Sequence, residues 1–127
     1  MAKKTKSGDL LKFLKKQIIS DMMPIEEMAS FRKKTTGIDN IIFISPKGGA
    51  RHSARIKVAI DPPDSISPSS GCVSVEVSDY SVHGTLKVST DLYTKLKKFI
   101  DINRSVIIDY WNYKISTDEM TSKLRGV

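Results

Sequence analysis

The sequence predicts an α+β fold: an antiparallel meander of about four strands, a long C-terminal helix packed on one face, and short N-terminal and C-terminal helices. Two observations favour it. Apolar and polar residues alternate through the middle of the chain, and apolar residues recur at every third or fourth position through the last third. The chain has 127 residues, the length of one domain. We therefore expect one domain over residues 8–127, preceded by a disordered basic tail of residues 1–7.

Four stretches have strand character, namely residues 40–44, 54–60, 72–77 and 82–88. The alternation is clearest in the second stretch, where Ile56, Val58 and Ile60 share one face. Between the second and third stretches, residues 61–71 hold three of the five prolines and four serines, which is typical of a loop. Gly84 in the last stretch indicates a bulge.

Helical spacing flanks these strands. A first helix is expected from residue 8 to about residue 20, with an apolar stripe of Leu10, Leu14 and Ile18. Pro24 is suited to the first turn of a second short helix, which we expect to run through Phe31 and to stop at Gly37.

The C-terminal helix is expected from Ser89 or Thr90 to about Trp111. Its periodic positions are Leu92, Leu96, Phe99, Asn103, Ile107, Tyr110 and Trp111. The sequence "STDE" at residues 116–119 matches a capping box and predicts a final short helix.

The net charge of +7 is unevenly distributed. Residues 1–60 carry thirteen basic and five acidic residues, whereas residues 61–127 carry eight and nine. A basic half favours polyanionic partners, with nucleic acid first.

The single cysteine, Cys72, excludes an internal disulfide and suits a cytoplasmic location. No apolar run approaches the roughly 20 residues of a spanning helix, so we expect no membrane insertion.

The stretch "PKGGARHS" follows a predicted strand and resembles part of a phosphate-binding loop. The second glycine–lysine pair and its hydroxyl residue are missing, and "RIKVAI" returns the chain to a strand rather than a helix. We therefore interpret it as a hairpin tip, with Gly48 and Gly49 supplying positive φ angles.

Basic side chains surround this tip and predict a phosphate-binding surface. The candidate nucleic-acid contacts are Lys47, Arg51, His52, Arg55 and Lys57, with Lys12, Lys15 and Lys16 as auxiliaries from the N-terminal helix. The alternative is a solvated tip whose charges only maintain solubility. The N-terminal helix is likewise suited to capping the core, to an anionic surface, or to pairing with a partner protein or a second copy in a homodimer.

The sequence offers little for catalysis. His52 and His83 form a conceivable acid–base pair for RNA cleavage, which is the sharpest enzyme hypothesis. Asp64 and Glu76 loosely match a nuclease motif, but Ser78 stands where that motif needs lysine. Two histidines and one cysteine do not make a four-ligand structural zinc site, and no metal or cofactor is expected.

Of the aromatic cluster near the end of the long helix, Trp111 is expected to pack against the sheet.

Two segments, "FRKKTTGIDNIIFISPKGGARHSARIKV" and "INRSVIIDYWNYKISTDEM", resemble small uncharacterised proteins of bacteria and their mobile elements. The resemblance covers about the last three quarters of the chain. It implies a conserved fold unit and brings no catalytic residue. The leading hypothesis is therefore non-catalytic binding of nucleic acid. The alternatives are a protein-interaction module of a mobile element, such as an inhibitor or accessory subunit, and a small ribonuclease-like toxin.

Overall fold

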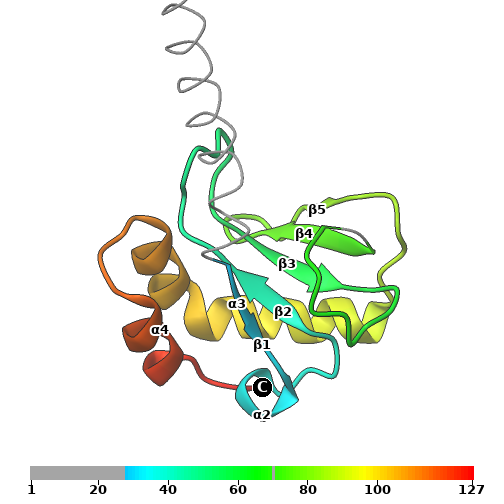
Figure 1. The fold of residues 1–127 in the computed structure, drawn as a ribbon. Coiled ribbons are helices and arrows are strands. Elements are labelled where there is room, and N and C mark those ends of the chain that lie inside the picture. The colour runs from blue at the N-terminus through cyan, green and yellow to red at the C-terminus, as the bar shows by residue number, and fades with distance from the viewer. Residues whose placement is uncertain (1–27, 70) are drawn as a thin grey trace, which may run out of the picture.

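The computed structural model describes residues 28–69 and 71–127. A five-stranded antiparallel sheet lies on one long helix, as Figure 1 shows. The elements in chain order are β1 (Ala29–Phe31), α2 (Lys33–Thr36), β2 (Ile42–Ile44), β3 (Arg55–Ala59), β4 (Cys72–Glu76), β5 (Val82–His83), α3 (Thr90–Trp111) and α4 (Thr117–Lys123). The expected tail of residues 1–7, the first helix and its three lysines lie outside the described residues.

The sheet is a meander in which each strand pairs with the next, in the order β1-β2-β3-β4-β5. All four pairings are antiparallel. The predicted α+β class and the meander are therefore confirmed, but the sheet has five strands where the sequence predicts about four.

The additional strand is β1, which lies where the sequence predicts the second short helix. Ala29–Phe31 pairs with Ile42–Ile44 of β2, and the Phe31 side chain is buried in the core. Spacing of three residues fits a helix, but pairing with β2 gives this segment both backbone hydrogen bonds and burial of an aromatic ring. From residue 28 to residue 37, the part of this segment that the structure describes, helical structure is limited to the single turn α2, which ends at Gly37 in the left-handed conformation, as predicted.

The last strand is shorter than the sequence predicts. Only Val82 and His83 pair with β4, and the chain leaves the sheet at Gly84, whose φ is 139°. A Cβ atom on Gly84 would lie 3.1 Å from a Val73 methyl group, so the chain passes close over β4 here. Leu86 and Val88 still pack against the core, although they are not in a strand.

Helix α3 covers the inner face of the sheet along its whole length (Figure 1). Its first turn is capped by Ser89, whose Oγ accepts a hydrogen bond from the Leu92 amide at 3.2 Å. The buried residues of the helix are Leu96, Phe99, Ile100, Asn103, Ile107, Tyr110 and Trp111, which is the predicted stripe with Ile100 in place of Leu92. All of them except Asn103 belong to one core cluster with the inward residues of β2, β3 and β4.

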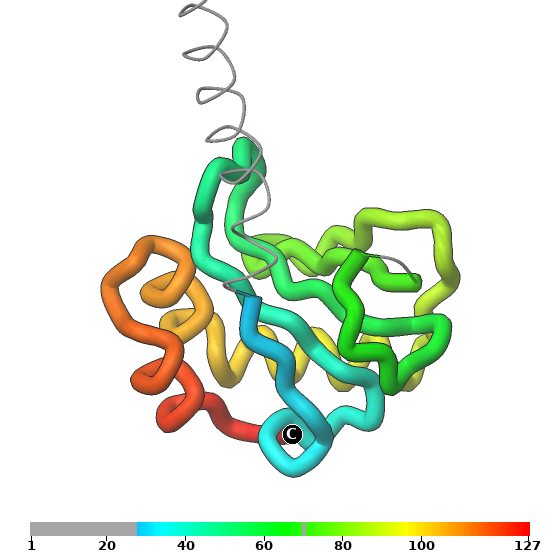
Figure 2. The backbone as a smooth tube through the Cα atoms, viewed as in Figure 1, coloured from blue at the N-terminus to red at the C-terminus, as the bar shows by residue number. Residues whose placement is uncertain are grey.

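The C-terminal segment returns to the start of the sheet. The predicted capping box is present, with Ser116 and Glu119 each accepting from the other's backbone amide, and it begins α4. Figure 2 shows the tail that follows α4 reaching α2. There the Val127 amide donates to the Thr36 carbonyl at 2.8 Å.

Buried Asn103 ties this tail to α3. Its Nδ2 donates to the carbonyls of Phe99 and Arg125, each at 2.9 Å, and its Oδ1 accepts from the Arg125 amide at 2.8 Å. Asn103 is only 1% exposed and its two bonds to the Arg125 backbone are partly buried, so losing the amide leaves these backbone groups less well satisfied.

We predict that Asn103→Ala lowers the free energy of unfolding by about 2–3 kcal/mol, because it leaves the Arg125 amide and carbonyl without their partner. Urea denaturation followed by circular dichroism measures the change. Asn112→Ala is the matched control: this asparagine is exposed just after α3, and its change should cost less than about 0.5 kcal/mol. Equal losses in the two variants would contradict the prediction.

Candidate basic pocket

The hairpin tip between β2 and β3 is held against the C-terminal end of α3. The Lys47 amide donates to the Trp111 carbonyl at 3.0 Å, and the Gly48 amide donates to the Tyr113 hydroxyl at 2.7 Å. A turn bond from the Ala50 amide to the Lys47 carbonyl closes the tip at 2.9 Å. These bonds give the tip a defined position, which a solvated turn does not have.

Only one of the two tip glycines has the expected backbone conformation. Gly48 has a φ of 54°, whereas Gly49 lies outside the positive-φ region. The expectation for Gly49 is therefore wrong. The Ala50 amide bonds to the Lys47 carbonyl and closes a four-residue turn. A positive φ at its first central residue, Gly48, is compatible with such a turn without a second one at Gly49.

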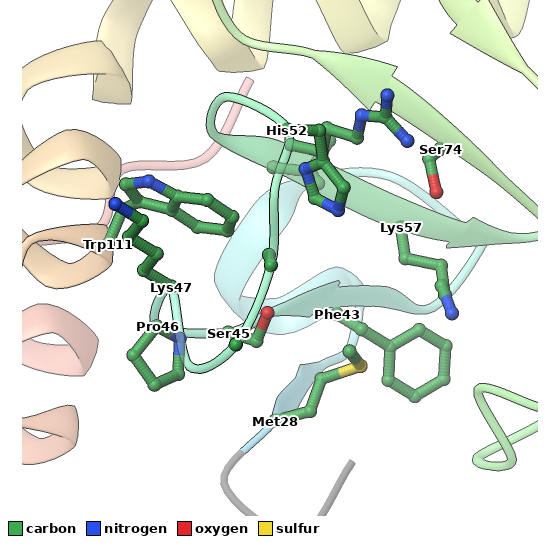
Figure 3. Close-up of a pocket in the computed structure, with 13 residues that line it drawn as sticks. Met28, Phe43, Ser45, Pro46, Lys47, His52, Lys57, Ser74 and Trp111 are labelled. Atoms are coloured by element: carbon green, nitrogen blue, oxygen red, sulfur yellow. The ribbon is translucent and has the colours of Figure 1, made fainter. Parts of the chain in front are cut away.

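A pocket of about 390 Å³ lies between this tip and the outer face of the sheet (Figure 3). Four of the predicted nucleic-acid contacts line it: Lys47, His52, Arg55 and Lys57. We call it the basic pocket. No carboxylate is among its described lining residues, so an anion entering it meets three cations and a histidine.

Lys57 of β3 lines the pocket from the outer face of the sheet. On the outer face of the sheet it lies opposite Phe43 of β2 and Ser74 of β4. Its Nζ donates to the Pro68 carbonyl at 3.1 Å, which steadies the half-buried side chain. Figure 3 shows Phe43, Lys57 and Ser74 side by side in the pocket.

Arg55 brings a donor whose hydrogen-bonding capacity is not used. Its Nη2 lies 3.7 Å from Glu76 Oε2, at the neighbouring position on β4. Its Nε is buried and has no hydrogen-bond partner in the described structure. A buried donor without an acceptor is costly, so the position of the Arg55 side chain has to be stabilised by its other contacts.

Trp111 forms the wall next to the tip. It is 7% exposed and belongs to the core cluster, so the expectation that it packs under the sheet is confirmed. The His52 ring lies over it, with ring centroids 5.5 Å apart and planes tilted by 33°. His52 Nδ1 lies 2.8 Å from the Ser53 carbonyl, which can only accept, so Nδ1 is the donor in this contact.

Glu76 organises the polar groups beside the pocket. Its carboxylate accepts from the Ser53 hydroxyl and lies 3.0 Å from His83 Nε2. The pKa of Glu76 is lowered from its ordinary value, chiefly by the hydrogen bond from Ser53. His83 and Arg55 lower this pKa further, whereas burial raises it. The carboxylate stands between serine and histidine, so the three do not form a nucleophile–base–acid series.

Not every predicted contact joins the pocket. Arg51 is exposed on the tip and is not among the lining residues. Lys12, Lys15 and Lys16 lie outside the described residues. His83 is engaged with Glu76 and does not line the pocket, so the two histidines have different partners.

No sequence pattern identified the other residues that line the pocket around these cations, chiefly Phe43, Ser45 and Ser74. Alternation places Ser74 on the outer face of its strand, but which residue lies beside it depends on register. Register in turn depends on the length and geometry of the connecting turns.

Comparison of the chain with family models, with curated proteins and with solved structures finds no match. The resemblance to small bacterial and mobile-element proteins thus stays a prediction. Residues 28–69 and 71–127 contain no group of three or more histidine, cysteine or acidic side chains placed to hold a metal. None of the described helices is long and apolar enough to cross a membrane.

The lowered pKa of Glu76 predicts an acid-sensitive contribution to stability. The unfolded chain has the ordinary value of 4.5, so the contribution is fully present above that pH and is lost as pH falls through the lower folded value. Between about pH 5 and pH 3, the free energy of unfolding should therefore fall less in Glu76→Gln than in the unmodified protein. Urea denaturation at a series of pH values measures both curves.

Asp64→Asn is the matched control, because the Asp64 carboxylate is exposed and makes no ion pair or hydrogen bond with the described residues. It should keep the pH dependence of the unmodified protein. Parallel curves for the unmodified protein and Glu76→Gln would contradict the role of Glu76.

Proposed function

We propose that this protein binds nucleic acid through the basic pocket without acting on it chemically. The observation that carries the proposal is that Lys47, Arg55 and Lys57 all line one concavity that no described carboxylate lines. Phosphate groups are the anions that a nucleic acid presents along its whole length, and lysine and arginine are their usual partners.

The arrangement of the donors supports phosphate as the bound group. The Nε of Arg55 has no acceptor in the described structure, and Ser45 and Ser74 add hydroxyl groups to the lining. The tip that carries Lys47 is fixed to the end of α3 by two hydrogen bonds. A ligand therefore does not have to order this loop on binding, which lowers the entropic cost of association.

Support for binding without chemistry comes from the two histidines. Acid–base cleavage of RNA needs two such groups at one phosphate, but only His52 lines the pocket. The ribonuclease-like toxin and the protein-interaction module remain alternative predictions. A partner protein whose binding survives high salt would favour the interaction module, because phosphate binding weakens steeply with salt.

The double variant Lys47→Glu/Lys57→Glu should weaken binding to a short single-stranded RNA at least about ten-fold at low salt, because it replaces two phosphate contacts with repulsion. It should also reduce the slope of log affinity against log salt by about 1.4, at roughly 0.7 for each contact on a single strand. Fluorescence anisotropy of a labelled oligonucleotide measures both quantities.

Lys98→Glu/Lys95→Glu makes the same charge change on an exposed surface of α3 outside the basic pocket, and is the matched control. It should lower affinity far less than the pocket variant, provided that thermal unfolding shows both variants folded. Equal losses in the two variants would reduce binding to a general effect of net charge and would contradict the proposal.

A further inference from the structure

A second concavity adjoins the basic pocket. It measures about 520 Å³, and its lining is mainly apolar: Ala29, Pro46, Tyr110, Tyr113 and Ile115 contribute to it. We call it the apolar groove. Met28 and Pro46 line both concavities, so the two are neighbours on either side of Pro46.

Tyr113 is an unusual feature of this groove. Its side chain is 62% exposed, among the highest values for the large apolar and aromatic residues described. Its backbone has a φ of 62° because it ends α3 in the left-handed conformation: the Tyr113 amide donates to the Tyr110 carbonyl and the Lys114 amide to the Asp109 carbonyl, which is a Schellman ending. This helix ending holds a large ring outward at a defined place.

The ring is also fixed in orientation. The Tyr113 amide donates to the Tyr110 carbonyl at 3.1 Å, and the hydroxyl accepts from the Gly48 amide at 2.7 Å. Both ends of the residue are therefore tied, one to the end of α3 and one to the tip that carries Lys47. An aromatic ring that is exposed and immobilised next to cations has the properties of a stacking platform.

We propose that the ligand is a single-stranded nucleic acid, with one phosphate in the basic pocket and a neighbouring base stacked on Tyr113. This inference rests on the proposed function and specifies its ligand. An apolar groove by itself does not specify an occupant, but the adjoining cations select one that combines negative charge with a flat apolar group. In a duplex the faces of the bases are stacked on one another, so a ring can reach them only in a single strand or an opened one.

The chain contains one tryptophan, Trp111, and it lines the basic pocket, so its intrinsic fluorescence reports occupancy without a label. The probes are an eight-nucleotide uridine RNA, a duplex DNA of the same length, and inorganic polyphosphate, which has the charge but no base. We expect the RNA to bind more tightly than the duplex at equal salt.

Two variants separate the roles of the ring. Tyr113→Leu removes both the ring and the hydroxyl, and it should bind RNA about 5- to 150-fold more weakly than Tyr113→Phe, the range measured for one stacked base, while polyphosphate affinity should be the same in the two variants within about two-fold. Tyr113→Phe keeps the ring and removes only the hydroxyl that accepts from Gly48. It should bind RNA within a few-fold of the unmodified protein.

The outcomes are distinguishable. If neither RNA nor polyphosphate binds the unmodified protein, the proposed function fails and the inference fails with it. If both bind but Tyr113→Leu changes neither, or if duplex binds as tightly as RNA, the stacking inference is overturned while phosphate binding stands. If Tyr113→Phe loses as much RNA affinity as Tyr113→Leu, the residue only positions the tip, which also overturns the inference. Circular dichroism confirms that each variant is folded.

Discussion

Helix α3 lies across the sheet because one face of its 22 residues is apolar, and most of the structure depends on that burial. Leu96, Phe99 and Ile107 are almost fully removed from water against the inward residues of β2, β3 and β4. Asn103, in the same stripe, holds the C-terminal tail by hydrogen bonds. The position of the helix therefore determines where both its C-terminal end and the tail are placed.

The basic pocket is a consequence of that placement. The end of α3 offers the Trp111 carbonyl and the Tyr113 hydroxyl to the amides of the hairpin tip, and those two bonds fix the tip over the outer face of the sheet. Cations brought together in this way repel one another, and the folded scaffold has to offset that repulsion. Glu76 offsets part of it from beside the pocket, through its ion pair with Arg55.

The two concavities differ in chemistry: cations line the basic pocket, and mainly apolar side chains line the groove beside it. Under the proposed function, the first accepts the charge of the ligand and the second accepts a flat apolar group. Tyr113 connects the two, because its hydroxyl holds the tip while its ring lines the groove. Charge alone would attract any polyanion, so in the proposed complex this ring is the group that would distinguish a single strand from other polyanions.

The sequence by itself determined the elements whose signal is local. Alternation located β3 and β4, periodicity located α3, and side-chain caps located the starts of α3 and α4. It also identified three cations and one histidine that line the pocket. Only the tertiary structure decided that Ala29–Phe31 is a strand, that Arg51 stays outside the pocket, and that Tyr113 stands beside it. The physical reason is that these features depend on contacts between residues that are far apart in the sequence, through strand pairing, register and the docking of the tip on α3. Gly48 and Tyr113, for example, are 65 positions apart. No local pattern carries that information.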